Sequence, residues 1–122
     1  MEVFLYFSEM EGKGREIRGI MEELFRSEQL HVHRSVDNLI QNILGPWDKK
    51  PIVVALIDRK DELIDLVSRR EQLYPVRLVL VLPEEEESVI SLAHRLRPNY
   101  LTYIHKDTED LKSVLRKMSA LN

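Results

Sequence analysis

Hydrophobic and polar positions follow two different periods along the chain. Short apolar or β-branched runs predict strands at residues 3–7, 30–34, 52–57, 76–82 and 100–105. The run at 52–57 (IVVALI) is apolar at every position, which is typical of a central strand covered by helices on both faces. The run at 30–34 (LHVHR) mixes polar and apolar side chains, so we expect it at an edge of the sheet.

The longer segments between these runs have the period of amphipathic helices. We expect Ser35 and Asp107 to cap two of these helices and Pro83 to open another, whose first turn would be Glu84–Glu87. A further helix is expected from Asp61 to about Tyr74. The predicted apolar stripes are Ile17, Ile20, Met21, Leu24 and Phe25; Val36, Leu39, Ile40, Ile43 and Leu44; Leu63, Ile64, Leu66 and Val67; and Leu111, Val114, Leu115 and Met118.

Five alternating strand–helix units predict parallel strands joined by right-handed crossovers. We therefore predict an α/β fold in three layers, with a five-stranded, doubly wound parallel sheet in the order 2-1-3-4-5. This is the flavodoxin-like arrangement. We expect residues 1–122 to form one domain, because the length leaves no room for a second.

The composition excludes several classes of function. The 122 residues include 21 acidic and 18 basic side chains, and a net charge of −3 does not favour nucleic-acid binding. There is no cysteine, which removes disulfides and thiolate metal sites. No apolar run approaches the roughly 20 residues of a membrane span, so we expect a soluble, cytoplasmic protein that does not bind membranes.

Candidate chemistry lies where the predicted strands end, since ligands bind there in open α/β sheets. Glu9 and Glu11 follow the first strand, Asp58 ends the third, and Lys106 ends the fifth. Converging carboxylates suit Mg²⁺, and a lysine can pair with a phosphoryl oxygen. Simpler interpretations remain open, in which Asp58 is only a cap for the helix near Asp61, Glu9 and Glu11 are partners of the first helix dipole, and Lys106 is a solvated side chain.

Two segments carry a resemblance to a known family. The run IVVALID ending at Asp58, and the run YLTYIHKDTEDLKSVLRKM containing Lys106, resemble parts of the response-regulator receiver (CheY-like) family. The resemblance covers nearly the whole chain in length and element order. It implies that Asp58 accepts a phosphoryl group from a histidine kinase and that Lys106 contacts that group. It also implies that Glu9 or Glu11 helps Asp58 to hold Mg²⁺.

The chain departs from this family at several positions. It has Ser8-Glu9 where the family has two adjacent carboxylates, and Leu82-Pro83 where the family has a threonine or serine at the end of the fourth strand. Asp58 is followed by Arg59 rather than by an apolar residue and proline, and Lys106 is followed by Asp107 rather than by proline. Without the hydroxyl at position 82, the group that reads the phosphoryl state is missing.

Our leading hypothesis is therefore a divergent, non-enzymatic receiver-like module that acts through protein–protein contacts and has a degraded phosphoacceptor site. The partner would be a histidine kinase or another signalling protein. In the receiver family the fourth helix, fifth strand and fifth helix commonly form a partner or homodimer surface. The resemblance places the following residues on that surface: His94, Arg97, Tyr103 and Lys112.

Two alternatives stay open. The first is a flavodoxin-like FMN binder that uses the loop Ser8–Gly14, and the second is a conventional, phosphorylatable receiver with an atypical site. His31 and His33 lie on one face of their strand but lack a third ligand, so we do not predict a zinc site. Trp47 is expected to pack against the fold rather than to bind a ligand.

Overall fold

The computed structural model describes residues 1–9 and 12–120. Its centre is one parallel sheet in the order β2-β1-β3-β4-β5, which confirms the predicted topology. The polar strand β2 lies at one edge, as expected, and β5 lies at the other. The strands are β1 Val3–Tyr6, β2 Leu30–His33, β3 Ile52–Leu56, β4 Arg77–Leu82 and β5 Tyr100–Tyr103.

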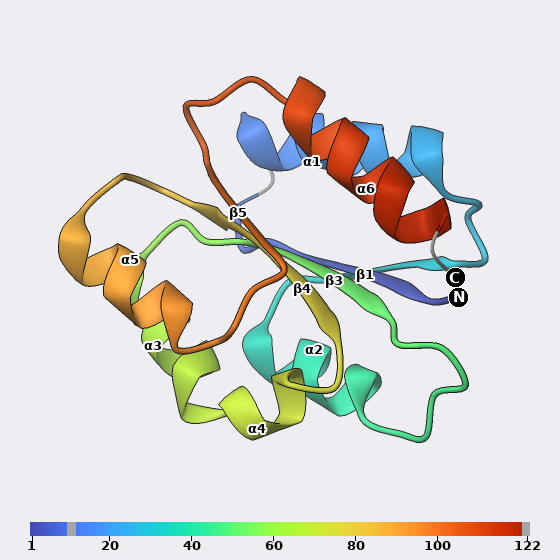
Figure 1. The fold of residues 1–122 in the computed structure, drawn as a ribbon, viewed down its shortest axis with the longest axis horizontal. Coiled ribbons are helices and arrows are strands. Elements are labelled where there is room, and N and C mark those ends of the chain that lie inside the picture. Colours follow the sequence, from blue (N-terminus) through green and yellow to red (C-terminus); the bar gives the residue numbers. More distant parts are fainter. Residues whose placement is uncertain (10–11, 121–122) are drawn as a thin grey trace.

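Helices cover both faces of the sheet. Figure 1 shows α1 and α6 on one face and α2, α3, α4 and α5 on the other, so the fold has three layers. Within the described ranges, no helix is long and apolar enough to cross a membrane. The helices are α1 Lys13–Leu24, α2 Val36–Ile43, α3 Lys60–Ser68, α4 Arg70–Leu73, α5 Glu87–His94 and α6 Glu109–Ala120.

The core consists of two apolar layers, one on each side of the sheet. Because side chains alternate along a strand, Leu5 of β1 packs with α1 and α6 while Phe4 packs with the helices of the other face. Every residue of β3 is buried, with at most 1% of its surface exposed. The central strand is therefore apolar on both faces because both faces are covered.

The predicted cap Ser35 is present, and Asp107 binds the start of α6 from two residues before its first residue. The Ser35 hydroxyl accepts a hydrogen bond from the backbone N–H of Asn38 at 3.1 Å, which satisfies a free donor in the first turn of α2. The Asp107 carboxylate accepts a hydrogen bond from the N–H of Glu109, the first residue of α6, at 3.0 Å. Short polar side chains thus begin both helices, as the sequence indicates.

Two predicted core residues are exposed. Leu44 is 54% exposed because α2 ends at Ile43 and the backbone of Leu44 is already extended, so its side chain leaves the helical stripe. Ile64 is 51% exposed because the buried stripe of α3 includes Glu62 and Leu63 and turns Ile64 towards solvent. A buried glutamate was not part of the predicted apolar stripe.

Two helix boundaries also differ from the prediction. The helix expected from Asp61 to about Tyr74 is interrupted at Arg69, which separates α3 from α4. The helix expected to open at Pro83 begins only at Glu87. The N–H groups of Val89 and Ile90 both donate to the C=O of Glu86, so the first helical turn starts there, and Glu84 and Glu85 belong to the preceding loop.

Candidate functional site

Asp58 links the carboxyl ends of β1 and β3, which are neighbours in the sheet. Its Oδ2 atom accepts hydrogen bonds from the Ser8 hydroxyl at 3.1 Å and from the backbone N–H of Glu9 at 3.2 Å. The interpretation of Asp58 as the cap of the following helix is wrong, because the N-cap residue of α3 is Arg59. The carboxylate of Asp58 instead holds the loop that follows β1.

A buried carboxylate that the sequence did not reveal lies directly behind Asp58. Glu62 is only 5% exposed. Its Oε1 atom accepts hydrogen bonds from the backbone N–H groups of Asp58 at 3.1 Å and Arg59 at 2.9 Å, and its Oε2 atom accepts one from the Tyr6 hydroxyl. Three donors converge on this carboxylate, which offsets part of the cost of burying its charge.

The environment of Tyr6 favours the neutral phenol. Burial of the hydroxyl, and then its hydrogen bond to Glu62 and the negative charge of that carboxylate, raise the pKa of Tyr6 well above its usual value. Tyr6 therefore keeps its proton and acts as a donor to Glu62. The signal in the sequence was faint: a tyrosine within the apolar strand VFLY, and a glutamate three residues after the helix N-cap.

The loop after β1 is also held from the side of β2. The guanidinium group of Arg34 donates from Nε to the C=O of Phe7 at 3.0 Å and from an Nη atom to the C=O of Ser8 at 2.6 Å. The same guanidinium group lies 4.9 Å from the centre of the Phe7 ring. Arg34 thus satisfies two backbone carbonyls at the end of β1.

Helix α1 packs tightly against this loop. A Cβ atom at Gly14 would lie 2.5 Å from the backbone oxygen of Glu9 and 3.3 Å from the Phe7 ring, so only glycine fits there without a shift. The side chain of Glu9 itself is exposed. Glu11 lies outside the described residues, so its place relative to the dipole of α1 stays a prediction.

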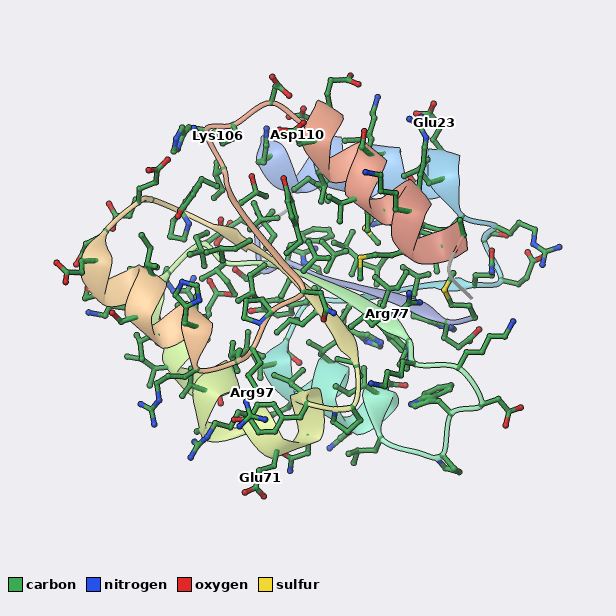
Figure 2. The ribbon with its side chains drawn as sticks, in the orientation of Figure 1. Glu23, Glu71, Arg77, Arg97, Lys106 and Asp110 are labelled. Atoms are coloured by element: carbon green, nitrogen blue, oxygen red, sulfur yellow. The ribbon has the colours of Figure 1, made fainter. Side chains whose placement is uncertain are left out.

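Lys106 follows β5 in an exposed loop (Figure 2). In the described part of the chain, its Nζ atom forms an ion pair with Glu85, 3.8 Å from Oε1. His105 lies 3.2 Å from the same carboxylate oxygen. The C=O of Lys106 accepts a hydrogen bond from Lys13 at 2.8 Å, which ties the loop to α1. The side chain of Lys106 thus pairs with the β4–α5 loop.

The carboxyl end of β4 provides no hydroxyl group. Leu82 is fully buried, and Pro83 follows it without a backbone N–H. The next hydroxyl along the chain is that of Ser88, in the first turn of α5. It accepts a hydrogen bond from Lys60 at 3.1 Å and donates one to the Glu86 carboxylate.

The described residues do not by themselves fit a Mg²⁺ site. Among residues 1–9 and 12–120, no three His, Cys, Asp or Glu side chains come together in a way that could hold a metal ion. Asp58 already uses Oδ2 for two hydrogen bonds, and Glu9 contributes its backbone N–H to one of them. A Mg²⁺ site with Glu9, Glu11 and Asp58 remains a prediction that depends on Glu11.

The two histidines of β2 are half-buried and pack on a core aromatic ring. Their rings stack on Phe4, with centroid distances of 5.0 Å for His31 and 5.9 Å for His33. His31 also contacts Glu2 at 2.7 Å, and burial lowers the pKa of His33. Trp47 meets the edge of the same Phe4 ring at 6.0 Å, in agreement with its predicted packing role.

The residues assigned by resemblance to a partner surface come from β5 and from the elements before and after it in the chain. His94 ends α5 and is exposed, and Arg97 is exposed in the turn before β5. Tyr103 ends β5 and is half-buried, with its ring stacked on His105 at 5.7 Å. Lys112 of α6 pairs with Glu109 at 3.8 Å. Arg97 and Tyr103 thus lie just before and at the end of β5, whereas His94 and Lys112 belong to the helices that precede and follow it.

Comparisons with protein-family models, curated proteins and solved structures found no match to this chain.

Proposed function

We propose that this protein is a divergent, receiver-like signalling module that acts through protein–protein contacts and does not switch through phosphorylation of Asp58. The observation that carries the proposal is the hydrogen bonding of the Asp58 carboxylate to Ser8 and to the N–H of Glu9, at the position where a phosphoryl group would be attached. One oxygen of the Asp58 carboxylate is therefore already bonded to the loop that follows β1.

Phosphoryl transfer depends on a positioned nucleophile and on cations that neutralise the developing charge. Here the lysine that resembles the family's phosphoryl contact pairs with Glu85, and Leu82 replaces the hydroxyl that would read the phosphoryl group. A conformational switch also needs an element with two arrangements of similar free energy. The three hydrogen bonds to Glu62 stabilise a single arrangement of the β3–α3 turn.

The surface at β5 is the better candidate for function. All four residues of β5 are half-buried, and two of them are tyrosines, a residue type enriched in protein interfaces. The elements before and after β5 in the chain, α5, α6 and the adjoining loops, carry exposed charged side chains. We therefore assign partner binding, by a histidine kinase or another signalling protein, to this surface.

Incubation with acetyl phosphate and Mg²⁺, followed by intact-mass measurement, tests the proposal. We expect no phosphoryl adduct of about 80 Da on the wild-type chain. The matched control is Asp58→Asn, which keeps the side-chain shape and removes the nucleophile. An adduct that forms on the wild type and is absent from Asp58→Asn would contradict the proposal and identify a conventional receiver.

The same preparation tests the flavodoxin-like alternative. The Ser8 hydroxyl, which would contact a flavin phosphate, donates to Asp58 instead. We therefore expect added FMN to keep its full fluorescence and to leave the thermal unfolding midpoint unchanged. Stoichiometric quenching of FMN fluorescence would replace the signalling proposal with a flavin-binding one.

A further inference from the structure

Strand β2 forms the edge of the sheet opposite to β5. In the described part of the chain only β1 pairs with it. Edge strands expose backbone N–H and C=O groups on their outer side, and natural proteins often protect them with charged residues or proline. The sequence of β2 (LHVH) contains no proline, lysine, arginine or carboxylate. The edge is therefore short but unprotected.

The hydrogen bonds to β1 indicate which residues of β2 face outwards. The C=O groups of Gln29 and His33 accept hydrogen bonds from Val3 of β1 at 2.9 Å and from the residue after β1 at 3.3 Å. Backbone groups of successive residues in a strand point to opposite sides, so residues 29, 31 and 33 face β1. The N–H and C=O groups of Leu30 and Val32 therefore point away from the sheet.

The side chains of β2 are ordered in the extended strand before any partner binds. On one face of the sheet, His31 and His33 stack on Phe4 at centroid distances of 5.0 Å and 5.9 Å. On the other face, Leu30 and Val32 pack against the core and line a hollow of about 260 Å³ beside α1. A strand that is already ordered loses less entropy on pairing.

We propose that β2 pairs in antiparallel orientation with β2 of a second copy of this chain, with His31 of both copies at the two-fold axis. In this register Leu30 of each copy lies opposite Val32 of the other, and the two residues exchange both of their backbone hydrogen bonds. The inference goes beyond the proposed function, because it concerns the opposite edge of the sheet and leaves the surface at β5 free.

The register follows from the strand itself. Pairing through Leu30 and Val32 uses outward-facing residues of β2 alone and sets apolar side chains opposite each other. An axis between His31 and Val32 would oppose outward-facing and inward-facing residues, so no ladder would form. An axis at Val32 would require Arg34, which lies in a bend after the strand and binds the end of β1. The strand is therefore complementary to itself in one register.

The charges beside β2 also allow this surface to meet itself. Arg18 and Glu22 of α1, which line the hollow, pair at 3.8 Å. Arg26 and Glu28, before the strand, pair at 3.6 Å. Like charges brought together at an interface oppose association. Because these segments are balanced within each copy, the charge repulsion between two copies is small at this edge.

Pairing of β2 with β5 of another copy is the other contact that two edge strands allow. That head-to-tail contact leaves a free edge at each end, so the assembly does not close. The hollow at β5 includes the charged side chains of Lys106, Asp107 and Asp110, whereas the hollow at β2 is lined by Phe25 and the apolar side chains of β2 together with a balanced ion pair. Burying charged groups against apolar ones is costly, which favours the closed two-fold dimer.

Disulfide cross-linking tests the register, because the chain has no cysteine of its own. In the proposed dimer, position 31 of one copy faces position 31 of the other as a non-hydrogen-bonded pair, in which the side chains lie closest. We expect His31→Cys, oxidised in air with copper phenanthroline, to form a disulfide-linked dimer on a non-reducing gel. The matched controls are Val32→Cys, which would face Leu30 of the other copy, and Thr102→Cys in β5. Both should stay monomeric.

Sedimentation equilibrium of the full chain, from micromolar to millimolar concentration, tests the dimer without cross-linking. We expect a monomer–dimer equilibrium for the wild type. Val32→Pro removes an outward N–H from each copy and leaves the hydrogen bonds to β1 in place, so it should raise the dissociation constant at least about tenfold. Val32→Lys should do the same through a charge in the edge strand. Thr102→Lys makes that change in β5 and should leave the dissociation constant unchanged. Circular dichroism checks that each variant is folded.

A wild-type chain that stays monomeric over the whole range would overturn the inference. Equal cross-linking of His31→Cys and Thr102→Cys would also overturn it, because the disulfide would then report random collision. Cross-linking of Val32→Cys in place of His31→Cys would exclude the proposed register, and assemblies that keep growing with concentration would show the head-to-tail contact instead. None of these results depends on the acetyl phosphate experiment, so failure of the inference and failure of the proposed function are distinguishable.

Discussion

The carboxyl end of β1 and β3 and the open edge at β5 differ in how their polar groups are used. At the first region, the carboxylates of Asp58 and Glu62 are bonded to donors from β1 and from the turn after β3. At β5, charged segments of opposite sign adjoin an uncovered strand. The comparison teaches that the crevice where this fold usually binds ligands is largely occupied by internal hydrogen bonds here. Beside β5, the printed pairs of Lys106 with Glu85 and of Lys112 with Glu109 join exposed side chains instead.

The largest effect is expected from removing the buried carboxylate. Glu62→Ala leaves the Tyr6 hydroxyl and the N–H groups of Asp58 and Arg59 without their acceptor, and we expect a loss of about 3 kcal/mol in the free energy of unfolding. Urea unfolding measures this loss. Glu71→Ala, at an exposed position of α4, is the control and should change little. If both substitutions lowered the free energy of unfolding equally, the hydrogen bonds to Glu62 would not contribute to stability beyond the effect of an exposed glutamate.

The next effect concerns the close contact between α1 and the loop after β1. Gly14→Ala forces the Cβ atom against the Glu9 carbonyl oxygen and should destabilise the protein by about 2 kcal/mol. Gly19→Ala, in the same helix, meets no atom within 4 Å and should stabilise it by about 0.5–1 kcal/mol through helix propensity. Thermal unfolding of both variants checks the opposite signs. If Gly14→Ala stabilised the protein instead, the loop after β1 would have to shift away from the new Cβ atom at little cost in free energy.

A smaller effect, which depends on pH, is expected at Tyr6. Tyr6→Phe removes one donor to Glu62 and should cost about 1.5 kcal/mol at neutral pH. The folded state raises the pKa of Tyr6, so its contribution is complete below the unfolded pKa of about 10 and is lost as the pH rises further. Wild-type stability should therefore fall more steeply above about pH 10 than that of Tyr6→Phe. Urea unfolding across this pH range measures how the free energy of unfolding of each protein changes with pH. The same pH dependence for both would contradict the raised pKa of Tyr6 in the folded state.

The smallest effect is expected from Ser8→Ala. This change removes one of the two hydrogen bonds to Asp58 Oδ2 and should cost about 1 kcal/mol or less, because the N–H of Glu9 remains bonded. We expect no phosphoryl adduct on this variant either, since Lys106 still pairs with Glu85. Intact mass after acetyl phosphate treatment checks this. An adduct on Ser8→Ala alone would mean that the single hydroxyl bond blocks the chemistry.

Predictions from sequence succeeded where local pattern and tertiary context agree. The run at 52–57 is apolar throughout, and it forms the central strand because both faces of that strand are covered. Ser35 and Asp107 bind first-turn N–H groups, as their short polar side chains suggest. The prediction that Leu44 and Ile64 are buried was wrong. An apolar stripe in the sequence shows neither where the helix ends nor which side of the stripe faces the sheet.

The elements that carry the candidate site could be placed from the sequence, whereas the hydrogen-bond partners of its polar groups could not. The carboxyl ends of the strands could be identified from the order of the elements, and Asp58 was singled out from that order. The roles of Glu62 and Arg34 were not predicted, because glutamate and arginine are ordinarily solvated, and the capping-box position of Glu62 does not indicate that its side chain is buried. The Tyr6 partner of Glu62 and the Phe7 partner of Arg34 are 56 and 27 residues away along the chain, and local patterns do not encode such contacts.

The sequence alone determined the fold class and the strand order, because hydrophobic periodicity and chain connectivity leave few alternatives for five strand–helix units. Only the tertiary structure decided how the polar groups are paired. Whether Asp58 binds the loop after β1 or caps α3, and whether Lys106 pairs with Glu85, depends on distances between strands and loops that are remote in sequence. Hydrogen bonds act over about 3 Å, so these choices are made only once the sheet has brought the chain ends together.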